Sequence, residues 1–254
     1  MATSAVRHRD GRFEDSFFSG MAVLVLVTVF LGFARTYYLA GVFKADPLPP
    51  LLHVHGAVFS AWIVLLIVQV SLVAADRVDL HRRLGLLGFC LPCLMVILGL
   101  LVATNSMVRY FDAAEAGHMQ TELRANYVFQ TADMLIFSTL IYFAFRNRLN
   151  PPAHKRLILI ATIALLDAAF GRWPIDAVSQ HFQFGCYALL LLLVGYDLWS
   201  TRRIHRATLW GGLFLVVLYL VRAPIRYTAP WQAFAAWVQN LARSSHFFDS
   251  HFFH

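Results

Sequence analysis

The sequence has little charge. Lys, Arg, Asp and Glu together make up 14% of its 254 residues, against about 25% in an ordinary soluble domain, while hydrophobic residues reach 59%. So few charged side chains cannot cover a soluble globule of this size. The composition argues against a separate soluble domain and is typical of an integral membrane protein.

Acidic residues are scarcer than basic ones. The chain has 14 Asp and Glu against 21 Lys and Arg, which gives a net charge of +7. In a soluble protein this excess would suggest nucleic acid as a partner. Here the cations stand in short links between apolar runs, which is the pattern that orients membrane proteins. We therefore expect the lipid bilayer as the partner, and no nucleic acid.

Cysteine is also scarce, with three in the chain: Cys90, Cys93 and Cys186. All three fall inside predicted spans, which excludes an extracellular disulfide framework. Cys90 and Cys93 belong to a CLPC motif, and in a thioredoxin-like protein such spacing supports redox chemistry. A thiol buried in an apolar span is a poor nucleophile, so we expect packing cysteines and a helix kink at Pro92.

What the sequence does contain is a series of long apolar runs. A bilayer core needs about 20 apolar residues per helix, and the first run is too long for a cleavable signal and lacks a clear cleavage site. The predicted fold class is an all-α integral membrane protein with seven transmembrane helices, an N-terminal span and three hairpins. The spans are expected over residues 17–40, 51–74, 83–104, 124–146, 154–172, 181–200 and 207–224.

Basic residues predict the orientation. With seven spans, four groups that hold 13 of the 21 Lys and Arg fall on one face, which should be cytoplasmic. Residues 1–16 are then a cytoplasmic segment, 17–224 the membrane domain, and 225–254 an outer segment. Within the outer segment, 231–242 predicts an interfacial amphipathic helix, followed by an aromatic HFF-repeat tail. The four groups are Arg7, Arg9 and Arg12; Arg77, Arg82 and Arg83; Arg146, Arg148, Lys155 and Arg156; and Arg202, Arg203 and Arg206.

In each predicted hairpin, a histidine beside Arg or Lys stands at the start of the second helix. A helix start has unpaired N–H groups and a partial positive charge, so a basic start favours anions. This cytoplasmic rim could hold an anionic lipid or ligand, its imidazoles could bind a transition metal if the helices converge, or it could serve topology alone. Asp197 could orient one histidine or pair with an arginine. The rim consists of His81, Arg82, Arg83, His154, Lys155, Arg156, Arg203 and His205, with His81, His154 and His205 as the metal ligands.

Ionisable side chains inside spans are costly and usually face the bundle interior. Several gather in the outer half, where they form either a polar pocket or a structural ion-pair network. We favour an ion pair between Arg222 and Asp133 or Asp167; in a polar pocket, His55 would be a proton carrier or ligand. Asp167 and Arg172 lie five residues apart on a helix and are poor partners. The full outer set is His53, His55, Ser60, Gln130, Asp133, Asp167, Arg172 and Arg222.

Four stretches carry a resemblance: LHVHGAVFSAW, RVDLHRRLGLLG, AHKRLILIATIALLDAAFGR and RIHRATLWGG. Together they resemble uncharacterised bacterial polytopic membrane proteins, described as hypothetical or predicted, with His-Arg helix starts. The resemblance covers about residues 45 to 224, and the CLPC motif does not belong to it. It implies a multi-pass protein of the bacterial inner (plasma) membrane and carries no activity, substrate or cofactor.

Three functions are compatible with these patterns. The first is a non-enzymatic binder of a small molecule or lipid in the outer polar pocket. The second is a redox protein with b-type haem, ligated outside by His55 and His181 and inside by two of His81, His154 and His205. The third is a histidine-metal membrane hydrolase, with Asp133 as its acid or base.

Overall fold

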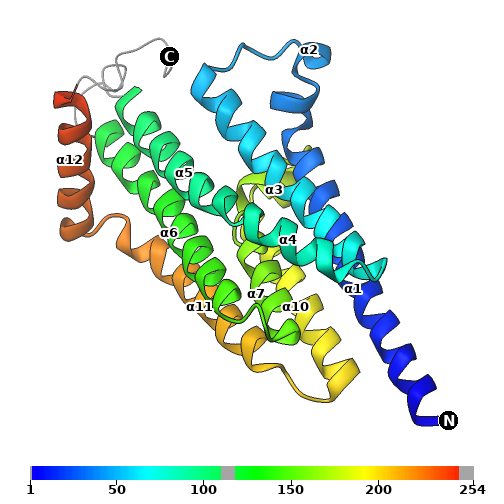
Figure 1. Cartoon of the computed structure of the whole chain (residues 1–254). Helices are drawn as coiled ribbons and strands as arrows, with labels where there is room; N and C mark the ends of the chain where they lie inside the picture. Colours follow the sequence, from blue (N-terminus) through cyan, green and yellow to red (C-terminus); the bar gives the residue numbers. More distant parts are fainter. Residues whose placement is uncertain (1, 110–117, 246–254) are drawn as a thin grey trace.

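A computed structural model describes residues 2–109 and 118–245, with backbone alone for 2–12 and His118. All regular elements in these ranges are helices, as the sequence predicts (Figure 1). They are α1 (Ala2–Phe33), the π-helix η1 (Ala34–Tyr38), α2 (Ala40–Phe43), α3 (Pro50–Ala74), α4 (Val78–Gly88), α5 (Cys90–Arg109), α6 (His118–Arg146), α7 (Pro151–Ile163), α8 (Asp167–Phe170), α9 (Asp176–Ser179), α10 (Phe182–Thr201), α11 (Arg206–Ile225) and α12 (Ala229–Ser244).

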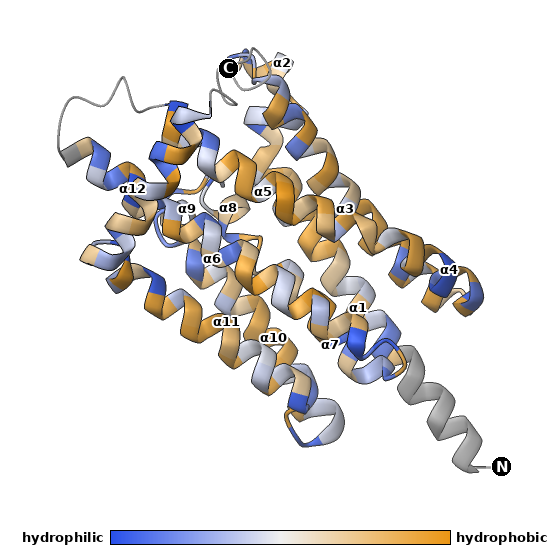
Figure 2. Ribbon diagram, turned by 60° about the vertical axis from the view of Figure 1, so that its left-hand side comes forward, coloured by the Kyte–Doolittle hydropathy of each residue, from blue (hydrophilic) through white to orange (hydrophobic). Residues whose placement is uncertain are grey.

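Six stretches of the described chain are long and apolar enough to cross a membrane, as a multi-pass protein requires. Apolar residues make up most of the length of these helices, and hydrophilic residues gather mainly at the helix ends and turns (Figure 2). Large apolar side chains such as Leu191, Trp210 and Leu220 are more than 60% exposed, as lipid-facing side chains are in the isolated chain. The six stretches are Phe13–Tyr38, Pro50–Ala74, Val78–Arg109, Met119–Arg146, Phe182–Thr201 and Arg206–Ile225.

The prediction of one continuous span over 154–172 is wrong. Helix α7 ends at Ile163, and the short helix α8 begins only at Asp167. The break leaves carbonyl groups free, and neighbouring helices supply their donors: the Cys186 thiol bonds the carbonyl of Ile163, and the Tyr219 hydroxyl bonds that of Ala164 at 2.9 Å. Eight of the 13 residues of α7 are buried, so this element forms the centre of the bundle and not a lipid-facing span.

Pro92 accounts for a second interruption. Proline has no N–H to donate and its ring clashes with the carbonyl four residues earlier, which here belongs to Gly88. Helix α4 ends at Gly88 and α5 begins at Cys90, so the predicted kink is confirmed. The expectation that Cys90 and Cys93 are buried packing residues is wrong, because both are exposed at the start of α5.

Helix α8 is held tightly between α1 and α10. At Gly32 of α1, a Cβ atom would lie 2.8 Å from the Cα of Ala169, so only glycine allows the two backbones to approach this closely. At Gly185 of α10, a Cβ would meet the ring of Phe170 at 2.6 Å. These close contacts fix the broken element, and with it the position of Asp167.

The amphipathic helix predicted over 231–242 is confirmed as α12, which packs on α5 and α6. Its buried residues are Ala235, Gln239 and Ala242, whereas Phe234 and Trp237 are exposed. Gln239 is fully buried and its amide donates to the Met107 carbonyl at 3.0 Å, so one polar side chain anchors the helix. The HFF-repeat tail lies outside the described residues, as do the side chains of Arg7, Arg9 and Arg12.

Candidate functional site

Three of the predicted outer residues meet in one buried triad. The Arg222 guanidinium donates to Asp133 at 2.7 Å and to Asp167 at 2.9 Å, so the expected pairing exists with both acids. Asp133 comes from α6, Asp167 from the start of α8 and Arg222 from α11. Their exposed fractions are 9%, 6% and 2%. The guanidinium also lies on the Tyr219 ring, 3.8 Å from its centroid, which completes a closed environment.

The other five outer residues do not join this triad. Gln130 is exposed on α6, and Arg172 is exposed while donating to the Ala168 carbonyl at 2.6 Å. The Ser60 hydroxyl pairs with that of Tyr38 at 2.7 Å. His53 is exposed, and His55 stacks on Phe59 with ring centroids 4.0 Å apart. The eight side chains therefore do not form one cluster, because the two acids and Arg222 pair with one another.

A second network lies at the basic end of the bundle. Arg156 of α7 donates to Asp197 of α10 at 2.6 and 2.9 Å, and both side chains are buried. The second oxygen of Asp197 accepts from the Thr208 hydroxyl at 2.6 Å and from the His205 backbone N–H at 3.0 Å. Asp197 thus pairs with an arginine, one of its two predicted roles, and ties α7, α10 and the start of α11 together.

Glu14 of α1 completes this network. Its carboxylate lies 2.6 Å from the Lys155 ammonium and 3.6 Å from the Arg156 guanidinium. Sequence reasoning missed Glu14 because it precedes the first apolar run and resembles an ordinary solvated residue. A signal was present in its spacing, since Glu14 stands three and four residues before Phe17 and Phe18, which pack on Tyr196 of α10.

The three rim histidines do not converge. His154 Nδ1 lies 2.9 Å from the Ala144 carbonyl, and His81 Nδ1 lies 2.6 Å from the Gln69 amide. His205 caps α11, where its Nδ1 accepts the Ala207 N–H at 3.0 Å. Within the described ranges, no three His, Cys, Asp or Glu side chains form a group that could hold a metal ion. The metal site predicted from these three histidines is therefore wrong.

Desolvation and the nearby Arg156 lower the pKa of His205 from its ordinary value. The imidazole therefore favours its neutral form, which is the form whose Nδ1 can accept a hydrogen bond. Its role as the cap of α11 and its neutral state are consistent with each other.

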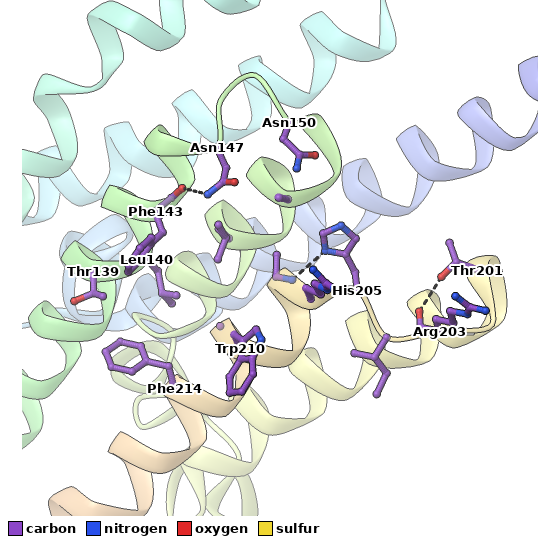
Figure 3. Close-up of a pocket in the computed structure, with 16 residues that line it drawn as sticks. Thr139, Leu140, Phe143, Asn147, Asn150, Thr201, Arg203, His205, Trp210 and Phe214 are labelled. Atoms are coloured by element: carbon purple, nitrogen blue, oxygen red, sulfur yellow. Dashed lines mark hydrogen bonds between the residues drawn. The ribbon is translucent and has the colours of Figure 1, made fainter.

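A cavity of about 930 Å³ opens beside His205, between α6, α7 and α11 (Figure 3). Its walls are mainly apolar, with Leu140, Leu157 and Phe214 among them, and its rim carries Arg203 and Arg206. No Asp or Glu stands among its lining residues. The cavity thus lies at the basic end, far along the bundle from the triad, and it includes Arg203 and His205 of the predicted rim.

The other residues of the predicted cytoplasmic rim do not line the cavity. Lys155 and Arg156 are held by Glu14 and Asp197, and Arg82 and Arg83 are exposed on α4. Sequence reasoning did not identify the apolar walls because Leu140 and Phe214 look like ordinary span residues. Comparisons of the chain with family models, with curated proteins and with solved structures give no match.

Proposed function

We propose that the protein is a multi-pass membrane protein that binds an anionic amphiphile, a lipid or a single-chain acid, in the cavity between α6, α7 and α11. The observation that carries this proposal is the pairing of apolar walls with a cationic rim that has no lining acid. A volume of about 930 Å³ lies within the range of small-molecule sites. The proposal keeps the binder function expected from the sequence and moves it to the basic end.

The rim supports an anionic head group. Helix α11 begins at Arg206 and α7 begins at Pro151, next to the lining residues Asn150 and Ala153. Two helix starts with partial positive charge therefore flank the same opening as Arg203 and Arg206. The apolar walls run inward from this opening, so a charged head would stay at the rim while a hydrocarbon tail enters.

Seven crossings, a cytoplasmic N-terminus and residence in a bacterial inner membrane belong to the same proposal. Support comes from the turns α3–α4, α6–α7 and α10–α11, which carry the described basic groups and lie toward the same end as the N-terminus (Figure 1). The broken element α7–α8 supplies the seventh crossing. A reporter enzyme fused behind residue 254, active only outside the cytoplasm, should be active; a silent but stably inserted fusion would contradict this orientation.

Binding can be tested by native mass spectrometry of the detergent-purified protein with phosphatidylglycerol, with phosphatidylcholine as the neutral comparison. Wild type should retain the anionic lipid preferentially. The double variant Arg203→Gln, Arg206→Gln removes about 1 kcal/mol per cation at a membrane surface, so its affinity should fall roughly thirtyfold. Competition by dodecyl phosphate would identify a single-chain anion as an equally good ligand.

The matched control is Arg82→Gln, Arg83→Gln, which removes the same charge at the same end but outside the cavity lining. It should retain the lipid like wild type. Ala207→Phe adds a ring to the cavity wall without changing charge and should also lose the ligand. Equal loss in the control pair would show general attraction to a basic surface and contradict a cavity site.

A further inference from the structure

The triad of Asp133, Asp167 and Arg222 has an unbalanced charge. Two carboxylates face one guanidinium, and all three side chains are buried. Arg222 lies roughly 24 Å along α11 from its start at Arg206, so the triad lies close to the opposite edge of a bilayer core of about 30 Å, where the surrounding helices bury it. A net negative charge there is costly, and such sites require a compensating positive charge.

The neighbouring groups do not supply that charge. Tyr219 on α11 and Cys186 and Tyr187 on α10 face the triad, but phenols and thiols are neutral or anionic and never cationic. Arg172 lies near Asp167, but its guanidinium donates to the Ala168 carbonyl, lies over the Phe33 ring and forms no ion pair with either acid among the described residues. Among the described ion pairs, those of Asp133 and Asp167 both go to Arg222.

Arg226, one turn beyond Arg222, does not balance the triad either. Its guanidinium lies 4.5 Å from the Tyr227 ring centroid and 5.7 Å from that of Phe129, at the end of α11. The Arg222 guanidinium also lies over Phe129, 5.0 Å from its centroid, but the ion pairs of both acids in the described chain go to Arg222 and not to Arg226. The missing positive charge must be held by the triad itself.

The two carboxyl groups identify the compensating species. Asp133 and Asp167 accept from the two terminal nitrogens of the same guanidinium, at 2.7 Å and 2.9 Å, so their carboxyl groups lie side by side. Two ionised carboxylates are acceptors only, so they cannot hydrogen-bond to each other, whereas one carboxylic acid can donate to one carboxylate. We infer that the triad binds one proton, shared between Asp133 and Asp167 and held in place by Arg222.

The broken helix suits such a site. Asp167 stands directly after the break between α7 and α8, and in membrane proteins interrupted helices line ion sites in the membrane interior. With the proton bound the triad is neutral, and without it the triad carries one negative charge. This site is independent of the amphiphile cavity, which opens at the opposite end of α11.

Infrared spectroscopy of the full-length protein in nanodiscs at neutral pH tests the inference. Ordinary Asp and Glu side chains are ionised under these conditions, so a protonated carboxylic acid gives a separate carbonyl band. Wild type should show this band, and it should shift on deuterium exchange. Its absence from the folded wild-type protein would overturn the inference.

Single substitutions assign the band. In Asp133→Asn and in Asp167→Asn, the remaining carboxylate balances Arg222 one to one, so the band should disappear from both. The control Asp176→Asn removes an exposed carboxylate at the start of α9 and should leave it unchanged. Persistence of the band in both single variants would place the proton elsewhere and overturn the assignment.

A metal cation is the competing occupant, and wild type alone distinguishes it. The band and the melting temperature should be the same in sodium, potassium and choline buffers, and the band should vanish as the pH is raised. A stability that depends on sodium or potassium, without a carboxylic acid band, would show a bound cation and overturn the proton site. These readouts hold even where an asparagine variant fails to fold.

Discussion

The two buried ion-pair networks of this protein differ in their charge balance. At the basic end, Glu14 and Asp197 face Lys155 and Arg156, so two acids meet two bases. In the triad, Asp133 and Asp167 face Arg222 alone. Both networks connect helices distant in sequence, and in each the principal arginine is 2% exposed. They differ in whether the site needs a further charge.

This difference separates a structural network from a binding site. The balanced network also satisfies the oxygens of Asp197 with the Thr208 hydroxyl and the His205 N–H, so no further charge is required there. The triad leaves the Arg222 Nε buried without a partner and has one acid in excess. Chemical activity in the bundle interior is therefore expected at the triad, while the basic end positions α7 and α11 around the cavity.

The same substitution should destabilise one network far more than the other, and this is the largest effect we expect. Asp197→Asn leaves the Arg156 guanidinium buried with a distant Glu14, and arginine cannot discard its proton. Breaking such a pair should lower the free energy of unfolding by about 3–5 kcal/mol. Asp133→Asn replaces one acid of an acid-rich site and should change stability by less than about 1 kcal/mol.

Chemical denaturation in one detergent, at neutral pH, measures both variants on the same scale. Asp176→Asn, at an exposed helix start, serves as the reference for removing a carboxylate charge without a buried partner. Equal losses in Asp197→Asn and Asp133→Asn would show that the triad needs both of its carboxylates as anions, and the contrast between the networks would disappear.

The sequence predicted the pairing of Arg222 because ionisable residues in apolar runs have few partners. Arg222, Asp133 and Asp167 fall at similar depths, and burial forces them together. The helix break before Asp167 was missed because periodicity treats 154–172 as one apolar run. A signal existed in Asp167 itself, because aspartate disfavours helix interiors and favours helix starts.

The cavity was beyond prediction for a different reason. Its walls come from three helices, and the turn that leads into α11 adds Arg203, Ile204 and His205 to the lining. No single segment of the sequence indicates the cavity, because leucine and phenylalanine, as at Leu140, Leu157 and Phe214, are equally common at lipid-facing and core positions. Arg203 and His205 were identified from their local pattern, but whether they face a cavity or solvent is a property of tertiary packing.

The smallest effect concerns His205, which joins the balanced network to the cavity rim. Because the pKa of its imidazole is lowered in the folded protein, protonation is less favourable there than in the unfolded chain. The contribution of this cap is therefore present above the ordinary histidine pKa of about 6.5 and is lost as the pH falls through the lowered value. His205→Asn keeps an acceptor for the Ala207 N–H that does not titrate.

Thermal unfolding should show the same stability for wild type and His205→Asn at about pH 8. At about pH 5 the variant should be the more stable of the two, by up to about 1 kcal/mol in the free energy of unfolding. His181→Asn is the matched control, because His181 occupies the same position at the start of α10 but makes no side-chain cap. It should leave the acid sensitivity unchanged. If His205→Asn retained the full acid sensitivity, the group that titrates between these two pH values would lie elsewhere than at the cap of α11.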